Sequence, residues 1–135
     1  MNIEQMQAYM DASPFIKFAG MKVVALDSDA ETLTMTMPLR PEFERGANTG
    51  QFHGGPIASL IDTAGCFGLI LVQDHGVPTI NFRTDYLRPA FNTSLTAVAS
   101  VRRVGRTVGV VDVDVYDDER RLVAVGRGTF GSQSG

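Results

Sequence analysis

The sequence is poor in the residues that build disulfides and metal centres, with one cysteine, Cys66, and two histidines, His53 and His75. A single cysteine excludes an internal disulfide. Because Cys66 lies in a long apolar segment, we expect its thiol to pack as a small hydrophobic group. No set of His, Cys, Asp and Glu has the spacing of a metal site, and the chain has no G-x-x-x-x-G-K loop for nucleotide phosphates. We therefore expect no metal and no bound cofactor.

Positive charge is also scarce, since 12 Lys and Arg face 15 Asp and Glu for a formal net charge of −3. This balance argues against broad nucleic-acid binding. The tightest basic group is Arg102, Arg103 and Arg106. It fits either a solvated strand end or a phosphate anchor, because guanidinium groups match phosphate oxygens.

The first residues lack the basic start and apolar core of a signal peptide, so we expect a cytoplasmic protein. Residues 56–72 are nearly all apolar but carry Asp62 near their middle and have no basic flank. A carboxylate at the centre of a bilayer is unfavourable by roughly 2.5–3.5 kcal/mol. The segment is therefore interpreted as a helix buried in a soluble protein with no membrane partner.

The order of elements predicts a single domain over residues 1–135. Residues 1–20 form a short N-terminal helical segment, with a helix over 3–12 and a further turn after Ser13 and Pro14. A long central helix covers 54–73, and residues 39–52 are interpreted as an irregular polar loop. The expected strands are 21–27, 31–37, 79–88, 94–104, 107–117 and 121–130. Their short connections favour an α+β fold in which a curved antiparallel sheet wraps the helix.

The most informative segment is His53-Gly54-Gly55 at the start of that helix, followed nine residues later by Asp62. A helix start carries unpaired N–H donors and partial positive charge, which suit the negative charge that develops on a carbonyl under attack. Asp62 is the only charged residue between Arg45 and Asp74, which suggests a functional role. The alternatives are a structural carboxylate at Asp62 and a histidine that only caps the helix.

These features resemble the hotdog fold and, within it, the phenylacetate-type acyl-CoA thioesterases (PaaI-like proteins). The resemblance covers roughly residues 15–131. It rests on the His-Gly-Gly motif with its acid, and on three further matches: Leu60 with Ala64-Gly65, the segment Asp85-Tyr86-Leu87-Arg88-Pro89-Ala90, and more loosely Arg102 to Arg106. It implies a curved sheet around one central helix.

The resemblance also implies roles for individual residues. Asp62 matches the acid that acts as nucleophile or general base, and Gly55 matches the glycine whose N–H polarises the thioester carbonyl. His53 matches a histidine assigned to orientation or to the leaving thiolate. Thr79 falls where many members have Ser or Thr to position water or the acid.

The chain departs from the family pattern at one place. Many members have Asn or Gln six residues before the motif histidine, where this chain has Ala47. Asn48 or Gln51 could fill the role.

The substrate implied by the resemblance is an acyl-CoA. Gly54, Gln51 and Phe52 would contact it, and Arg102, Arg103 and Arg106 would hold its phosphates. The acyl group would lie in an apolar slot against Phe52, Phe67, Ile57 or Tyr86. The alternatives are an acyl-carrier-protein thioester, a non-catalytic acyl-CoA binding protein, and a hotdog dehydratase or hydratase, whose usual Asp and His motif is not evident in this chain.

The spacing of the motif predicts an oligomer. Gly55 and Asp62 are seven residues apart, so they lie roughly 10 Å apart along a helix. One carbonyl cannot touch both within one subunit, whereas two antiparallel helices would bring Gly55 of one copy to Asp62 of the other. We therefore expect a homodimer with two shared sites, and the resemblance implies further pairing to a tetramer in many members.

Overall fold

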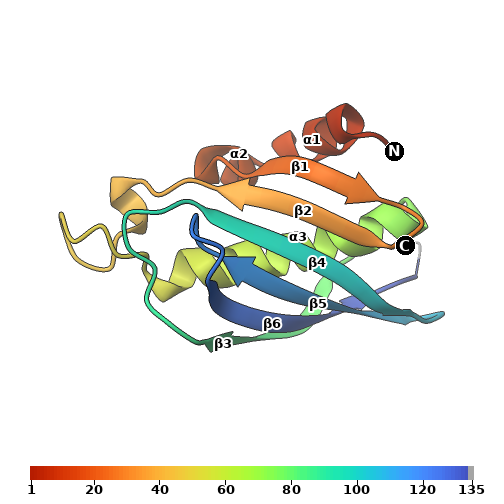
Figure 1. Ribbon diagram of the computed structural model, residues 1–135. Helices are drawn as coiled ribbons and strands as arrows, with labels where there is room; N and C mark the ends of the chain where they lie inside the picture. The colour runs from red at the N-terminus through yellow and green to blue at the C-terminus, as the bar shows by residue number, and fades with distance from the viewer. Residues whose placement is uncertain (134–135) are drawn as a thin grey trace.

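One curved antiparallel sheet lies against a 20-residue helix in this computed structural model, which describes residues 1–133 (Figure 1). The six strands follow the spatial order β1-β2-β4-β5-β6-β3, and every neighbouring pair is antiparallel. This is the arrangement predicted for the hotdog fold. The strands are β1 (Lys22–Asp27), β2 (Thr32–Met37), β3 (Thr79–Tyr86), β4 (Leu95–Val104), β5 (Val108–Tyr116) and β6 (Leu122–Gly131). The helices are α1 (Ile3–Asp11), α2 (Pro14–Ala19), the short 3-10 helix η1 (Pro41–Phe43) and α3 (Gly54–Gln73).

The N-terminal helices form where their capping residues place them. The Asn2 side chain accepts from the Gln5 N–H at 2.8 Å while the Gln5 side chain accepts from the Asn2 N–H at 2.9 Å, which is a capping box at the start of α1. Ser13 caps α2, and Gly20 ends it in the left-handed region at φ 72°. Both helices fall within residues 1–20, where the sequence predicts a helical segment, and they lie beside β1 (Figure 1).

Helix α3 is the centre of the hydrophobic core, and it has the bounds predicted from the sequence. It is long and apolar enough to cross a membrane, but 56% of its most apolar window is buried inside the fold. Glycines in the sheet allow this close packing. A Cβ on Gly126 would lie 2.5 Å from Ile61 Cγ2, and one on Gly109 would lie 2.6 Å from Leu69 Cδ2. Phe67, predicted to line the acyl slot, belongs to this core, as do Phe52 and Ile57, which are predicted for the same slot.

The predicted strands match the observed ones closely, with one informative difference. β3 ends at Tyr86, two residues early. Beyond it the N–H groups of Leu87 and Arg88 both donate to the Val123 carbonyl, so the chain leaves the ladder before Pro89. This departure places the segment after Tyr86 close to the start of α3.

The two edges of the sheet differ. At β1, the Gln7 side chain accepts from the Val23 N–H at 2.7 Å and donates to the Met21 carbonyl at 3.1 Å, so a side-chain amide takes the place of a neighbouring strand. At β3 both faces are largely exposed, including Ile80 and Phe82. An exposed apolar edge strand can pair with another chain.

Candidate functional site

The loop before α3 is irregular as predicted, apart from the short helix η1, but it is fixed by backbone hydrogen bonds. The His53 N–H donates to the Phe43 carbonyl at 2.7 Å, and the Phe52 N–H donates to the Ala90 carbonyl at 2.9 Å. Within the loop the Gly50 N–H donates to the Glu44 carboxylate at 2.6 Å. The start of α3 is therefore held from two sides, which favours a preorganised site.

The start of α3 leaves the Gly54 N–H without an acceptor in the described part of the chain. His53 is the N-cap, and its Nδ1 accepts from the Gly55 N–H at 2.9 Å. Pro56 has no N–H. No hydrogen bond is found for the Gly54 N–H within residues 1–133. The N–H that the resemblance assigns to the carbonyl, that of Gly55, is thus already occupied, and the available donor is that of Gly54.

The hydrogen bond that caps the helix also determines which nitrogen of the His53 ring carries the hydrogen. A neutral imidazole has one donor and one acceptor nitrogen, and the nitrogen that accepts determines the tautomer. Since Nδ1 accepts from Gly55, the neutral ring carries its hydrogen on Nε2. His53 is exposed, so its Nε2–H is open to solvent or a ligand.

Asp62 lies two turns further along α3 and is bonded to the first residue of β3. Thr79 Oγ1 donates to Asp62 Oδ1 at 2.8 Å. Thr79 is exposed and Asp62 only partly buried, so solvent or a ligand can reach the carboxylate. The two residues that the sequence placed in one site are therefore in contact, while Asp62 stands about 12 Å along the helix from Gly54.

A cleft of about 350 Å³ opens beside the start of α3. It brings together three predicted substrate contacts, Gln51, Phe52 and Gly54. Asn48 lines a different hollow with Glu44 and has a left-handed backbone at φ 63°. Of the two candidates for the missing polar helper, only Gln51 reaches this cleft. Its other lining residues are Arg45, Ile57, Tyr86, Leu87, Arg88, Pro89 and Ala90.

Two arginines of this cleft, Arg45 and Arg88, were not predicted as site residues. Arg88 lies within the segment from Asp85 to Ala90 that matches the family pattern, so the sequence could have identified it as a candidate site residue. Arg45 belongs to no sequence pattern. Its N–H donates to the Gln51 carbonyl at 2.8 Å, and this loop closure places it at the cleft.

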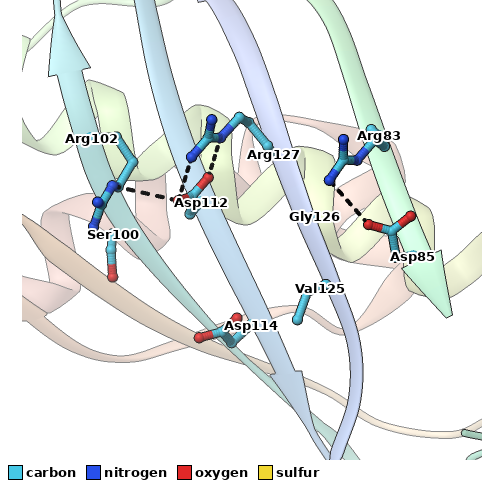
Figure 2. Close-up of a pocket in the computed structure, with 9 residues that line it drawn as sticks. All are labelled: Arg83, Asp85, Ser100, Arg102, Asp112, Asp114, Val125, Gly126 and Arg127. Carbon is cyan, nitrogen blue, oxygen red and sulfur yellow. Dashed lines mark hydrogen bonds and ion pairs between the residues drawn. The ribbon is translucent and has the colours of Figure 1, made fainter. Parts of the chain in front are cut away.

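The predicted phosphate anchor is not assembled beside Gly54 within one chain. Arg102 lies on the outer face of the sheet, away from α3, with its Nε 3.5 Å from the Asp112 carboxylate (Figure 2). Arg127 donates to the same carboxylate at 2.6 and 3.0 Å. This hydrogen bond from Arg127 holds the pKa of Asp112 below its usual value. Arg102 is thus part of an ion-pair network that the sequence pattern did not reveal.

The other two arginines lie near the β4–β5 turn. Arg103 is exposed near the end of β4. Arg106 lines a hollow with His75, which follows the C-terminal end of α3. Arg106 is therefore at the opposite end of the helix from Gly54.

Cys66 lies one turn after Asp62 and cannot act as a nucleophile near neutral pH. Burial, with a smaller contribution from the Asp62 charge, raises the pKa of its thiol to about 12. The Sγ is 3.7 Å from the Val77 carbonyl oxygen. Residues 1–133 contain no group of three or more His, Cys, Asp and Glu that could hold a metal ion.

Comparison with known sequences gives one family. The profile of the Thioesterase superfamily matches residues 49–124. A protein of Halobacterium salinarum is 37% identical over 135 residues, covering 92% of this chain and 87% of its own length. Acyl-coenzyme A thioesterase PaaI of Escherichia coli is 33% identical over 116 residues, covering 83% of this chain and 77% of its own length.

Comparison with solved structures agrees. The Escherichia coli PaaI protein superposes with a TM-score of 0.85 at 25% identity, covering 99% of this chain and 98% of that one. A thioesterase of Pseudomonas aeruginosa superposes with a TM-score of 0.85 at 26% identity, covering 97% of this chain and 93% of that one.

Proposed function

Because the chain belongs to the thioesterase superfamily and is a thioester hydrolase, we propose that it hydrolyses acyl-CoA thioesters to a free acid and CoA, with Asp62 as the reactive carboxylate. The observation that carries this assignment is the partly exposed Asp62 carboxylate, held by Thr79 at 2.8 Å in a helix that contains no other charged residue. PaaI and a second relative, YigI of Escherichia coli, are both named acyl-CoA thioesterases.

The reaction uses three groups. Asp62 either takes a proton from water as the water oxygen adds to the carbonyl carbon, or itself adds to that carbon to form an anhydride that water then opens. The Gly54 N–H and the helix dipole stabilise the oxyanion. As the carbon–sulfur bond breaks, the electron pair leaves with sulfur, and the His53 Nε2–H donates a hydrogen bond to the departing thiolate.

These groups meet only when two copies pair. Gly54 and Asp62 of one chain are about 12 Å apart along α3, too far for one carbonyl to touch both. Antiparallel helices bring Gly54 of one copy to Asp62 of the other, and the open edge at β3 offers the surface for such pairing. We propose a homodimer with two shared sites; a tetramer would need a further interface.

The proposed antiparallel dimer also indicates which part of the substrate each arginine would contact. Gln73, the last residue of α3, follows Asp62 by 11 residues, about 17 Å along the helix, and His75, which shares a hollow with Arg106, lies just past that end. In an antiparallel dimer the partner's Arg106 would therefore lie about this distance beyond Gly54 along the helix axis. The extended pantetheine arm of CoA is long enough to reach from the thioester to that point. The phosphates would be held there, and Arg45 and Arg88 would contact the part of the substrate nearer the thioester.

Thiol release from a panel of acyl-CoAs tests the proposed function. We expect turnover of at least one acetyl, hexanoyl, phenylacetyl, hydroxybenzoyl or palmitoyl thioester, with kcat/KM of about 10⁴ M⁻¹s⁻¹ or more. Cys66 adds little background to a thiol reagent because its thiol stays protonated. Matched acyl-carrier-protein thioesters form the second arm. If only the acyl-carrier-protein thioesters are hydrolysed, the substrate is a carrier-protein thioester and not an acyl-CoA. If folded protein hydrolyses neither kind of thioester, the proposal is contradicted.

The role of His53 is separable from its role as a helix cap. We expect His53→Ala to lower the free energy of unfolding by about 1 kcal/mol, because the Gly55 N–H loses its acceptor. His53→Asn keeps a capping oxygen and should be nearly as stable as wild type. Both variants lack the Nε2 donor, so both should lose about 10-fold or more in kcat. Denaturant unfolding and thiol release measure the two effects. Full activity in the Asn variant would reduce His53 to a cap.

A further inference from the structure

Tyr86, the last residue of β3, is bonded to the first turn of α3. Its hydroxyl donates to the Gly54 carbonyl at 2.7 Å. Its ring lies against the same residue, since a Cβ on Gly54 would be 3.1 Å from Tyr86 Cζ and Oη. The Tyr86 side chain therefore lies against Gly54, and both residues line the cleft beside the start of α3.

The contact completes a pair of restraints on one peptide unit. The Gly54 carbonyl and the Gly55 N–H belong to the same planar peptide group. Tyr86 binds the oxygen end and His53 binds the hydrogen end. A peptide between two glycines has wide conformational freedom because neither residue carries a Cβ. Here two side chains add restraints to this peptide beyond the hydrogen bonding of the helix itself.

A purely structural role does not explain the hydroxyl. In an α-helix that begins at Gly54, the carbonyl of that residue already accepts from the N–H four residues on. Tyr86 is thus not needed to satisfy a buried acceptor. Tyr86 is also 53% exposed, so it contributes little to the core.

We propose that Tyr86 is a positioning residue, whose hydroxyl holds the Gly54 carbonyl and thereby limits rotation about Gly54, so that the N–H of the preceding His53–Gly54 peptide points at the substrate carbonyl. This inference rests on the proposed function. It assigns to the end of β3 a part in the reaction that the spacing of the His-Gly-Gly motif does not reveal. Tyr86 acts through Gly54 and touches none of the reacting atoms.

The test is the Tyr86→Phe variant, which removes the hydroxyl and keeps the ring. We expect kcat to fall about tenfold, the effect of one lost hydrogen bond, with KM within about twofold of wild type. Tyr9→Phe is the matched control, because Tyr9 makes its aromatic contact with Phe67 and lies outside the cleft. That control should keep the wild-type kcat.

A double-mutant cycle decides whether Tyr86 acts through Gly54. Gly54→Pro removes the N–H, so adding Tyr86→Phe should lower kcat by less than about twofold further. An undiminished tenfold effect in that background would overturn the proposal. So would a rise in KM with unchanged kcat.

Hydrogen exchange tests Tyr86 without using activity. If the Tyr86 hydroxyl restrains the peptide, Tyr86→Phe should speed exchange of the Gly55 amide several-fold and leave core amides of α3 unchanged. Unchanged exchange at Gly55 would overturn the restraint. If wild type releases no thiol from any substrate, the proposed function fails, and the exchange result still decides whether Tyr86 holds this peptide.

Discussion

Replacing Asp62 by Asn is expected to reduce thioester turnover by about 10³-fold or more while leaving the fold intact. The amide has nearly the shape of the carboxylate, and its oxygen can still accept the hydrogen bond from the Thr79 hydroxyl, which lies 2.8 Å from Asp62 Oδ1 in the wild type. It cannot take a proton from water or form an anhydride. The loss should fall on kcat, because the acyl group and the CoA moiety are bound elsewhere.

The measurement is thiol release together with equilibrium binding of a non-hydrolysable acyl-CoA analogue. Asp114→Asn is the matched control, since Asp114 is an exposed carboxylate on the outer face of the sheet (Figure 2). It should keep wild-type turnover. If Asp62→Asn retains turnover within tenfold of wild type, the carboxylate is structural and the mechanism is wrong.

Gly54→Pro is expected to lower kcat by about 10²–10³-fold, the usual effect of removing an oxyanion donor. Proline suits this position because Gly54 is the first residue of α3, where proline is favoured. His53 already has the extended backbone, φ −67° and ψ 151°, that a following proline requires. The variant should therefore fold and lack only the free N–H.

Gly54→Ala is the control that isolates the N–H. Both variants place a Cβ 3.1 Å from the Tyr86 ring, which must shift by a few tenths of an ångström. Alanine keeps the donor, so its kcat should stay within about tenfold of wild type. Thermal unfolding verifies that the two variants are equally folded. Equal activity in the two would show that the Gly54 N–H takes no part.

The fold was predictable because its signals are local. α3 begins with two glycines after its histidine cap and ends at Gln73, where the capping residue Asp74 adopts the left-handed backbone at φ 66°. The strand pattern was equally clear in β2, where Leu33, Met35 and Met37 are buried. Such alternation involves only residues that are close together in the chain, so a strand can be recognised from the sequence alone.

The site was predictable only in part, because several contacts depend on side-chain direction and strand register. Which glycine N–H is free depends on the rotation of the His53 ring, which no spacing encodes. The role of Arg102 depends on the pairing of β4 with β5, where the register shifts between Val101 and Arg103. That pairing brings Arg102 to Asp112, whereas the sequence suggested only a group of three arginines.

The unequal edges of the sheet limit how this protein can assemble. Gln7 occupies backbone groups at the start of β1, and α1 lies beside that edge. The exposed strand β3 is the edge available for pairing. Two copies joined through β3 would each use that edge, so a third copy would have to pair with β1, whose start is already engaged by Gln7. Pairing through β3 therefore favours a sheet that ends at two subunits over one that extends into a ribbon.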